Sequence, residues 1–176
     1  MIEIRRIDAA HQADINLPNE PFRLFGRMAL TYGEGRWAYT MIRYAPEEAG
    51  EMTFPDENYR YAEMQDVVFL GAYDGVKCVG LAILEPGFLK YMYLSDLKVN
   101  SAYRGQGVGR RLMEAARGAA RAQGYCGVYT MGQDNNPGAC LFYLRTGFRI
   151  GGLDTETYRH TRQEGKADIL FYTECE

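Results

Sequence analysis

The fold is decided by Leu97-Lys98-Val99-Asn100-Ser101-Ala102-Tyr103-Arg104-Gly105-Gln106-Gly107-Val108-Gly109. An apolar strand ends at Val99, a polar turn follows, and the glycines lead into a helix-forming run from Arg110 to Gln123. Glycine lets the backbone approach a ligand closely, and the first amides of a helix have no partner within the helix. The stretch therefore predicts a strand–loop–helix joint that binds a phosphate group.

Three glycine motifs compete for this loop, and their spacings separate them. A P-loop needs Lys and then Ser or Thr after its last glycine, whereas Arg110 and Arg111 follow Gly109. A dinucleotide-binding turn needs Gly-x-Gly-x-x-Gly, which Gly105, Gly107 and Gly109 do not match. The remaining motif resembles the pyrophosphate loop Gln/Arg-x-x-Gly-x-Gly/Ala of the GNAT superfamily of N-acetyltransferases. A glycine-rich turn without a ligand is the alternative.

Strand and helix patterns surround the loop. We expect strands at residues 2–7, 67–73, 77–85, 91–99, 127–131, 148–153 and 167–173. We expect helices at residues 9–15 and 110–123, and a third that begins near Pro137 and ends at Gly147. Strand 127–131 should lie parallel to strand 91–99 through a right-handed crossover. Residues 22–30 and 36–44 form either a helix and a strand or a hairpin.

The long helix carries small and apolar side chains at spacings of three and four. The expected buried stripe is Val108, Leu112, Ala115, Ala119 and Ala122. Such a stripe suits packing on a sheet.

Composition limits the possible classes of protein. A chain of 176 residues with 47% hydrophobic and 24% charged residues predicts one globular domain over residues 1–176. The chain has no apolar run long enough to span a membrane, and its N-terminus does not resemble a signal peptide, so we expect a cytoplasmic protein without a membrane partner. A net charge of −3 argues against a nucleic-acid partner. The four scattered cysteines predict buried free thiols, with neither a zinc site nor disulfides.

Residues 45–66 form an acidic, loop-like segment with interleaved aromatic residues. Its carboxylates are Glu47, Glu48, Glu51, Asp56, Glu57, Glu63 and Asp66. Either the segment is a solvated loop, or it forms part of a wall that receives a positively charged substrate.

A second signature supports the resemblance to the GNAT superfamily. Asn136-x-x-Ala139-x-x-Phe142-Tyr143-x-x-x-Gly147-Phe148 is similar to the motif that lies about 30 residues after the pyrophosphate loop in that superfamily. The resemblance implies an α/β fold of the α+β type, with a mixed, mostly antiparallel sheet of six or seven strands. It also implies a central splayed parallel pair, about four flanking helices, acetyl-CoA as cosubstrate and no metal.

Longer sequence words resemble streptothricin acetyltransferases within that superfamily. They are Glu20-Pro21-Phe22, Asp96-Leu97-Lys98-Val99, Gln133-Asp134-Asn135-Asn136 and the run from Gly147 to Thr155. The resemblance implies acetyl transfer to an amine of the β-lysine part of streptothricin, a small cationic substrate, and hence antibiotic resistance. Another small amine, a polyamine or a protein amine remains an alternative substrate, as does a non-catalytic acyl-CoA sensor. Members of the superfamily are often homodimers, although the sequence identifies no interface.

The resemblance assigns cosubstrate contacts residue by residue. It implies that amides from Arg104 to Gly109, through Gly105, Gln106, Gly107 and Val108, hold the pyrophosphate. It implies that the main chain of Leu97, Lys98 and Val99 pairs with the pantetheine arm, while Asn136 and Tyr143 contact the cosubstrate from the second helix.

Direct transfer in a ternary complex needs a proton acceptor and a proton donor. A lysine-like amine has a pKa of about 10.4 in water and must lose a proton before it attacks. Asp96 is the candidate base, although an aspartate bonded to turn amides is an equal alternative, and Glu85 and Glu156 are in reserve. Tyr143 matches the tyrosine that protonates the departing thiolate in the family, and a core aromatic is the alternative. No histidine neighbours Cys140, so covalent catalysis is not expected.

Overall fold

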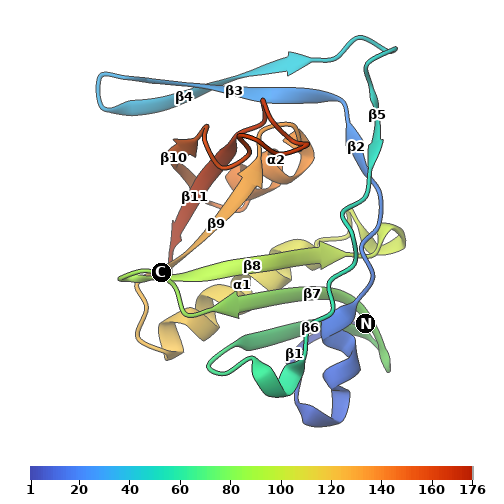
Figure 1. Ribbon diagram of the computed structural model, residues 1–176. Helices are drawn as coiled ribbons and strands as arrows, with labels where there is room; N and C mark the ends of the chain where they lie inside the picture. The colour runs from blue at the N-terminus through green and yellow to red at the C-terminus, as the bar shows by residue number, and fades with distance from the viewer. Residues whose placement is uncertain (176) are drawn as a thin grey trace. The chain divides into compact units, whose positions relative to one another are not determined.

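The chain divides into two compact units (Figure 1). The structure is a computed structural model that describes residues 1–175. The first unit comprises residues 1–20, 54–129 and the C-terminal residues from Glu174, and the second comprises residues 21–53 and 130–173. That residues 1–176 form one domain stays a prediction.

Antiparallel strands build the first unit. They are β1 (Ile2–Arg6), β6 (Val68–Asp74), β7 (Lys77–Glu85) and β8 (Tyr91–Val99). Next to β8 runs β9 (Gly127–Gln133), whose register pairs Tyr91 with Gly127 and Tyr93 with Tyr129 in parallel. The predicted parallel pairing of these two strands is therefore confirmed. Two further strands, β10 (Arg149–Asp154) and β11 (Asp168–Glu174), follow in the chain. Across residues 1–175 the hydrogen-bonded strand order is β1-β6-β7-β8-β9-β11-β10, a seven-stranded, mostly antiparallel sheet.

Both faces of the first unit's sheet are covered, which explains the nearly continuous apolar runs of β6 and β7. Helix α1 (Val108–Ala122) packs against β6, β7 and β8. The 3-10 helices η1 (Ala9–Asn16) and η2 (Tyr61–Glu63) belong to the same unit, and η1 is capped by the Asp8 carboxylate, as predicted. An apolar cluster joins η1 to β6 and β7 through Ile7, Ile15, Phe69, Tyr73, Leu81 and Ile83.

The predicted stripe on α1 is only partly correct. Val108 and Leu112 are buried as expected, but the remaining buried side chains are Met113, Ala116 and Ala120. Ala122 is exposed and Ala115 and Ala119 are half-buried. The expected stripe moved three residues on from Leu112, to Ala115. The buried positions instead follow Leu112 at a spacing of four, at Ala116 and Ala120.

The second unit contains two short ladders and the strands that close the sheet. β2 (Phe22–Leu24) pairs with β5 (Gly50–Met52), and β3 (Gly26–Gly33) pairs with β4 (Arg36–Arg43). Residues 22–44 therefore contain a hairpin and not a helix. Its turn residues Glu34 and Gly35 have φ of 50° and 74°, as the tightest hairpin turns require.

Helix α2 (Pro137–Arg145) packs against β2, β3 and β10 (Arg149–Asp154), and β10 pairs antiparallel with β11 (Asp168–Glu174). With η3 (Ser101–Tyr103), residues 1–175 contain two α-helices and three 3-10 helices. None of these helices is long and apolar enough to cross a membrane.

All four cysteines are free thiols, as predicted. Cys78, Cys140 and Cys175 are buried, but Cys126 is exposed, so its expected burial is wrong. Cys126 lies in the connection before β9, outside the regular strand that the core covers.

Candidate active site

The glycine loop enters α1 through two residues in the left-handed region. Gly105 has φ of +75° and Gly107, the N-cap of α1, has φ of +80°. A Cβ at either position would meet no atom within 4 Å, so backbone conformation and not space favours glycine. The Val108 side chain is buried and anchors the start of the helix. The cap residue Gly107 has no side chain that could accept from the amides of the first turn. This geometry is suited to an anion at the helix N-terminus.

Side chains of the loop fold back onto the residues that precede it. The Arg104 Nε donates to the Val99 carbonyl at 2.9 Å, and the Gln106 Nε2 donates to the Ala102 carbonyl at 2.8 Å. The Arg104 guanidinium also lies 3.6 Å from the Glu20 carboxylate. These contacts fix the shape of the loop, which is consistent with main-chain contacts to a ligand.

A β-bulge in β8 precedes the predicted base. The register pairs Ile83 with Asp96 and Leu84 with Leu94, so Ser95 is the extra residue on β8. A bulge turns a strand locally and re-aims the following side chains. After it, Leu97, Lys98 and Val99 pair with β7, and they lie beyond the last registered pair between β8 and β9, Tyr93 with Tyr129.

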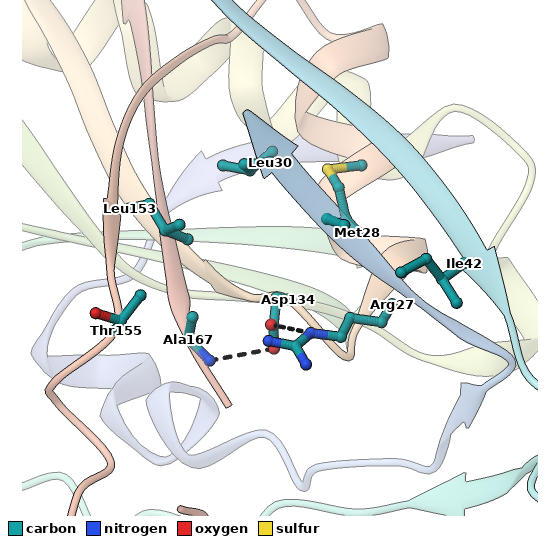
Figure 2. A pocket seen from close by; sticks show the side chains of 9 residues that line it. Arg27, Met28, Leu30, Ile42, Asp134, Leu153, Thr155 and Ala167 are labelled. Carbon is teal, nitrogen blue, oxygen red and sulfur yellow. Dashed lines mark hydrogen bonds and ion pairs between the residues drawn. The ribbon is translucent and has the colours of Figure 1, made fainter. Parts of the chain in front are cut away.

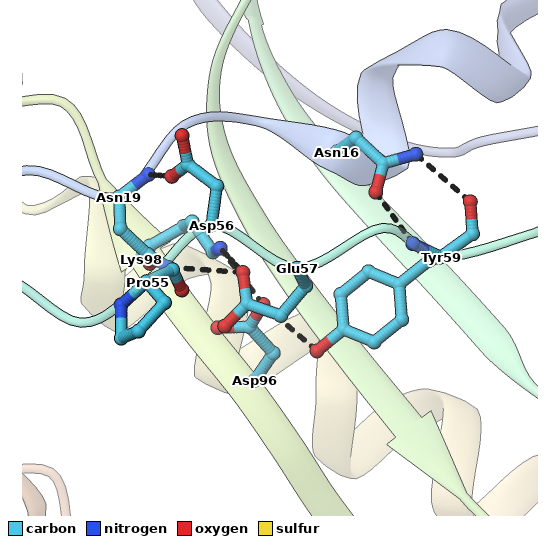
Figure 3. A network of polar contacts seen from close by, with 8 residues as sticks. All are labelled: Asn16, Asn19, Pro55, Asp56, Glu57, Tyr59, Asp96 and Lys98. Atoms are coloured by element: carbon cyan, nitrogen blue, oxygen red, sulfur yellow. Dashed lines mark hydrogen bonds and ion pairs between the residues drawn. The ribbon is translucent and has the colours of Figure 1, made fainter.

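Asp96 contacts other side chains and belongs to a partly buried polar network (Figure 3). The Lys98 Nζ lies 3.0 Å from Asp96 Oδ2 and 2.8 Å from Glu57 Oε2. The Tyr59 hydroxyl donates to Asp96 Oδ2 at 3.4 Å. The side chains of Lys98 and Asp96 are 10% and 12% exposed, and that of Glu57 is 32% exposed. The alternative role for Asp96 was an aspartate bonded to turn amides. Its partners in the structure are instead the side chains of Lys98 and Tyr59.

The two carboxylates of this network differ in pKa. Burial raises the pKa of Asp96, against the lowering influence of Lys98. Burial also opposes ionisation of Glu57, but hydrogen bonds from Lys98 and Asn19 lower its pKa overall. Burial and the nearby Asp96 charge raise the pKa of Tyr59. The pKa of Glu57 is therefore lowered and that of Asp96 raised, each relative to its ordinary value, so Asp96 takes a proton more readily than an exposed aspartate does.

Two asparagines attach the acidic segment to the first unit. The Asn16 side chain donates to the Tyr59 carbonyl at 2.9 Å and accepts from the Tyr59 amide at 2.7 Å. The Asn19 Nδ2 donates to the Pro55 carbonyl at 2.9 Å and to Glu57 Oε2 at 3.0 Å. The other carboxylates predicted for this segment are exposed. The solvated-loop interpretation thus fits most of the segment, whereas Glu57 faces inward.

The remaining predicted site residues lie in the second unit. Asn136 is the N-cap of α2, where its Oδ1 accepts from the Ala139 amide at 3.3 Å. Tyr143 is 8% exposed, and its ring centroid lies 5.3 Å from those of Phe148 and Phe171. The structure thus gathers the loop and Asp96 in one unit, and Asn136 and Tyr143 in the other.

The two reserve carboxylates have different surroundings. Glu85 is half-buried at the end of β7. Glu156 is exposed and paired with Arg159 at 2.8 Å. An exposed, paired carboxylate offers less to proton transfer than the buried Asp96.

A small pocket in the second unit is built around an ion pair (Figure 2). The Arg27 Nε donates to Asp134 Oδ2 at 2.6 Å, and Asp134 Oδ1 accepts from the Ala167 amide at 3.2 Å. The Asp134 side chain is only 3% exposed. The two charged groups of the pocket therefore form an ion pair with each other.

The sequence did not predict that the side chains of Glu57, Tyr59 and Lys98 form a network with Asp96. Asp96 and Lys98 are two residues apart on one strand, so the period of two could have placed Lys98 beside Asp96. Glu57 lies 41 residues from Lys98 in sequence, outside any strand or helix, and no local pattern indicates that contact.

Comparisons with known proteins identify the family of the chain. Residues 36–148 match the model of the acetyltransferase (GNAT) family. The chain is 30% identical to streptothricin acetyltransferase A of Bacillus subtilis (strain 168) over 169 residues, which cover 96% of this chain and 98% of that protein.

Two solved structures share the fold over 99% of each chain at 24% identity. One, with a TM-score of 0.88, is a candidate streptothricin acetyltransferase from Bacillus anthracis str. Ames in complex with acetyl coenzyme A. The other, with a TM-score of 0.81, is nourseothricin acetyltransferase.

Proposed function

The chain belongs to the acetyltransferase (GNAT) family, and we propose that it transfers an acetyl group from acetyl-CoA to a primary amine of streptothricin. It is an acetyl-CoA-dependent N-acetyltransferase by family. The observation that carries the choice of substrate is the similarity to streptothricin acetyltransferase A of Bacillus subtilis over nearly the full length of both chains. Resistance to the antibiotic would follow from the reaction.

The glycine loop binds the diphosphate of acetyl-CoA in this proposal. Left-handed Gly105 and Gly107 shape the turn, and the amides from Gly105 to Gly109 donate to the phosphate oxygens. The Arg104 amide, which the sequence also assigned to the diphosphate, instead donates to the Ser101 carbonyl at 3.2 Å. The positive end of the α1 dipole adds to the attraction. Main-chain groups of Leu97, Lys98 and Val99 bind the pantetheine arm, and Asn136 contributes from α2.

Asp96 removes the proton that prevents the amine from attacking. The substrate amine is an ammonium ion near neutral pH and becomes a nucleophile only as a neutral amine. The buried Asp96 carboxylate, with its raised pKa, is a better proton acceptor than an exposed aspartate. The proton moves to a carboxylate oxygen, directly or through water, and the electron pair left on nitrogen attacks the thioester carbon.

Tyr143 donates a proton to the thiolate that leaves when the carbon–sulfur bond breaks. A tyrosine hydroxyl can act as such a donor because its ordinary pKa is about 10. The ring is held among aromatic neighbours on α2 and β11, which restricts the orientation of the hydroxyl. A backbone amide near Val99 polarises the thioester carbonyl.

Incubation of purified protein with acetyl-CoA and streptothricin tests the proposal. Mass spectrometry should detect streptothricin with one added acetyl group, and the product should no longer inhibit bacterial growth. A protein that acetylates other small amines or polyamines but leaves streptothricin unchanged would refute the choice of substrate and keep the family activity.

A further inference from the structure

We infer that Lys98 is a positioning residue that shares its ammonium group between Asp96 and Glu57, and thereby keeps Asp96 ionised and oriented for proton transfer. The inference rests on the proposed function in one respect only, which is the role of Asp96 as base. The arrangement of charges can be tested without any substrate.

The ammonium group of Lys98 contacts two carboxylates. One ammonium group lies 2.8 Å from Glu57 Oε2 and 3.0 Å from Asp96 Oδ2, and its side chain is 10% exposed (Figure 3). Glu57 is also held by the Asn19 Nδ2 at 3.0 Å. The fixed Glu57 therefore restricts Lys98, and Lys98 in turn restricts Asp96, which sits just after the bulge in β8.

Negative charge exceeds positive charge in this cluster. Two ionised carboxylates and one ammonium group leave this cluster with a net charge of −1. The groups that face Asp96 are Lys98 from its own strand and Glu57 and Tyr59 from the acidic segment, while Glu85 of β7 acts on Tyr59. Lys98 favours the carboxylate form of Asp96, whereas burial and Glu57 oppose it. The ionisation of Asp96 therefore depends on how Lys98 divides its attraction between the two carboxylates.

Lys98 and Glu57 have opposite effects on the charge of Asp96. Removal of the ammonium group would leave Asp96 and Glu57 facing each other as like charges in a partly buried site. Removal of the Glu57 charge would leave Lys98 with Asp96 as its one ionic partner in the network drawn in Figure 3. The two changes should therefore move the titration of Asp96 in opposite directions, which a merely structural role would not do.

The experiment follows the carboxyl carbon of Asp96 by NMR as a function of pH, with the signal assigned from the Asp96→Asn variant. In Lys98→Met the midpoint should move to higher pH by about one unit or more, because a charge partner within 4 Å is lost. In Glu57→Gln it should move to lower pH. In Lys98→Arg, which keeps the positive charge, the midpoint should stay close to the wild-type value. Lys77→Met and Glu51→Gln, which change exposed residues, should leave it unmoved.

Steady-state kinetics on the same variants separate this inference from the proposed function. The acidic limb of kcat/KM should move with the NMR midpoint in both directions. NMR midpoints that do not move in folded Lys98→Met and Glu57→Gln proteins would overturn the inference. If the midpoints move as expected but the acidic limb does not, the role of Asp96 as base fails while the division of charge by Lys98 stands. Should Lys98→Met not fold, Glu57→Gln and Lys98→Arg still provide the test.

Discussion

Alanine substitution at two glycines, one before α1 and one within it, should have opposite effects on stability. Gly107 is the N-cap with φ of +80°, whereas Gly118 is an exposed residue in the middle of the helix. A Cβ at either position would meet no atom within 4 Å. Steric clashes with neighbours therefore do not distinguish the two sites, and only backbone conformation does.

The magnitudes follow from that conformation. Alanine in the left-handed region costs about 1–2 kcal/mol, so Gly107→Ala should be destabilised by about that amount. Alanine within a helix is favoured over glycine by about 0.5–1 kcal/mol, so Gly118→Ala should be more stable than wild type. The two variants should differ by about 1.5–3 kcal/mol in free energy of unfolding. In a chain of this length, each kcal/mol corresponds to about 2–4 °C in Tm.

Thermal or denaturant unfolding measures the stability, and calorimetric titration with coenzyme A measures the function. If Gly107→Ala relaxes to another backbone conformation, the strain appears on binding instead, and affinity should fall about 5- to 30-fold. Gly118→Ala should bind as tightly as wild type. A Gly107→Ala protein with the stability and the coenzyme A affinity of Gly118→Ala would refute the structural account of the loop.

Four further predictions concern individual side chains. Tyr143→Phe should keep the aromatic packing but lower kcat about 10²-fold or more, with KM for acetyl-CoA nearly unchanged in steady-state kinetics, because a proton donor acts in the transition state. Asp96→Asn should lower kcat/KM about 10²- to 10⁴-fold and remove the acidic limb of its pH profile. In the wild type, activity should be lost as pH falls through the pKa of Asp96. Because burial raises that pKa, the loss should occur at a higher pH than for an exposed aspartate. A thiol reagent should modify Cys126 first and give a single adduct by mass spectrometry of the native protein, and Cys126→Ser should abolish it, because the other three thiols are buried. Arg27→Ala should destabilise the protein by about 1–3 kcal/mol in denaturant unfolding, because it removes the ionic partner of the buried Asp134, and an equal loss in the exposed control Arg36→Ala would contradict this.

Much of the sheet could be predicted because its signals are local. Apolar runs marked β6, β7 and β8, and the connection between β6 and β7 contains Gly75, whose φ of +61° favours glycine. The glycine loop and the start of α2 at Pro137 were also local signals, each tied to the backbone conformation that those residues favour.

The rest depends on contacts between distant parts of the chain. Residues 22–44 are rich in aromatic residues without a clear period, so only the left-handed turn at Glu34 and Gly35 identifies the hairpin. Lys98 has a second ionic partner besides Asp96, which is Glu57. Glu57 lies in a segment without regular structure and is held there by Asn19. Such a contact is set by the packed fold and leaves no spacing in the sequence.

Calorimetric titration of the wild-type protein with coenzyme A and with pantetheine, which lacks the diphosphate, tests the central claim most directly. The loop before α1 predicts that coenzyme A binds and that pantetheine binds much more weakly. Absence of binding by coenzyme A, or equal affinity for both compounds, would contradict the claim that this loop holds a diphosphate.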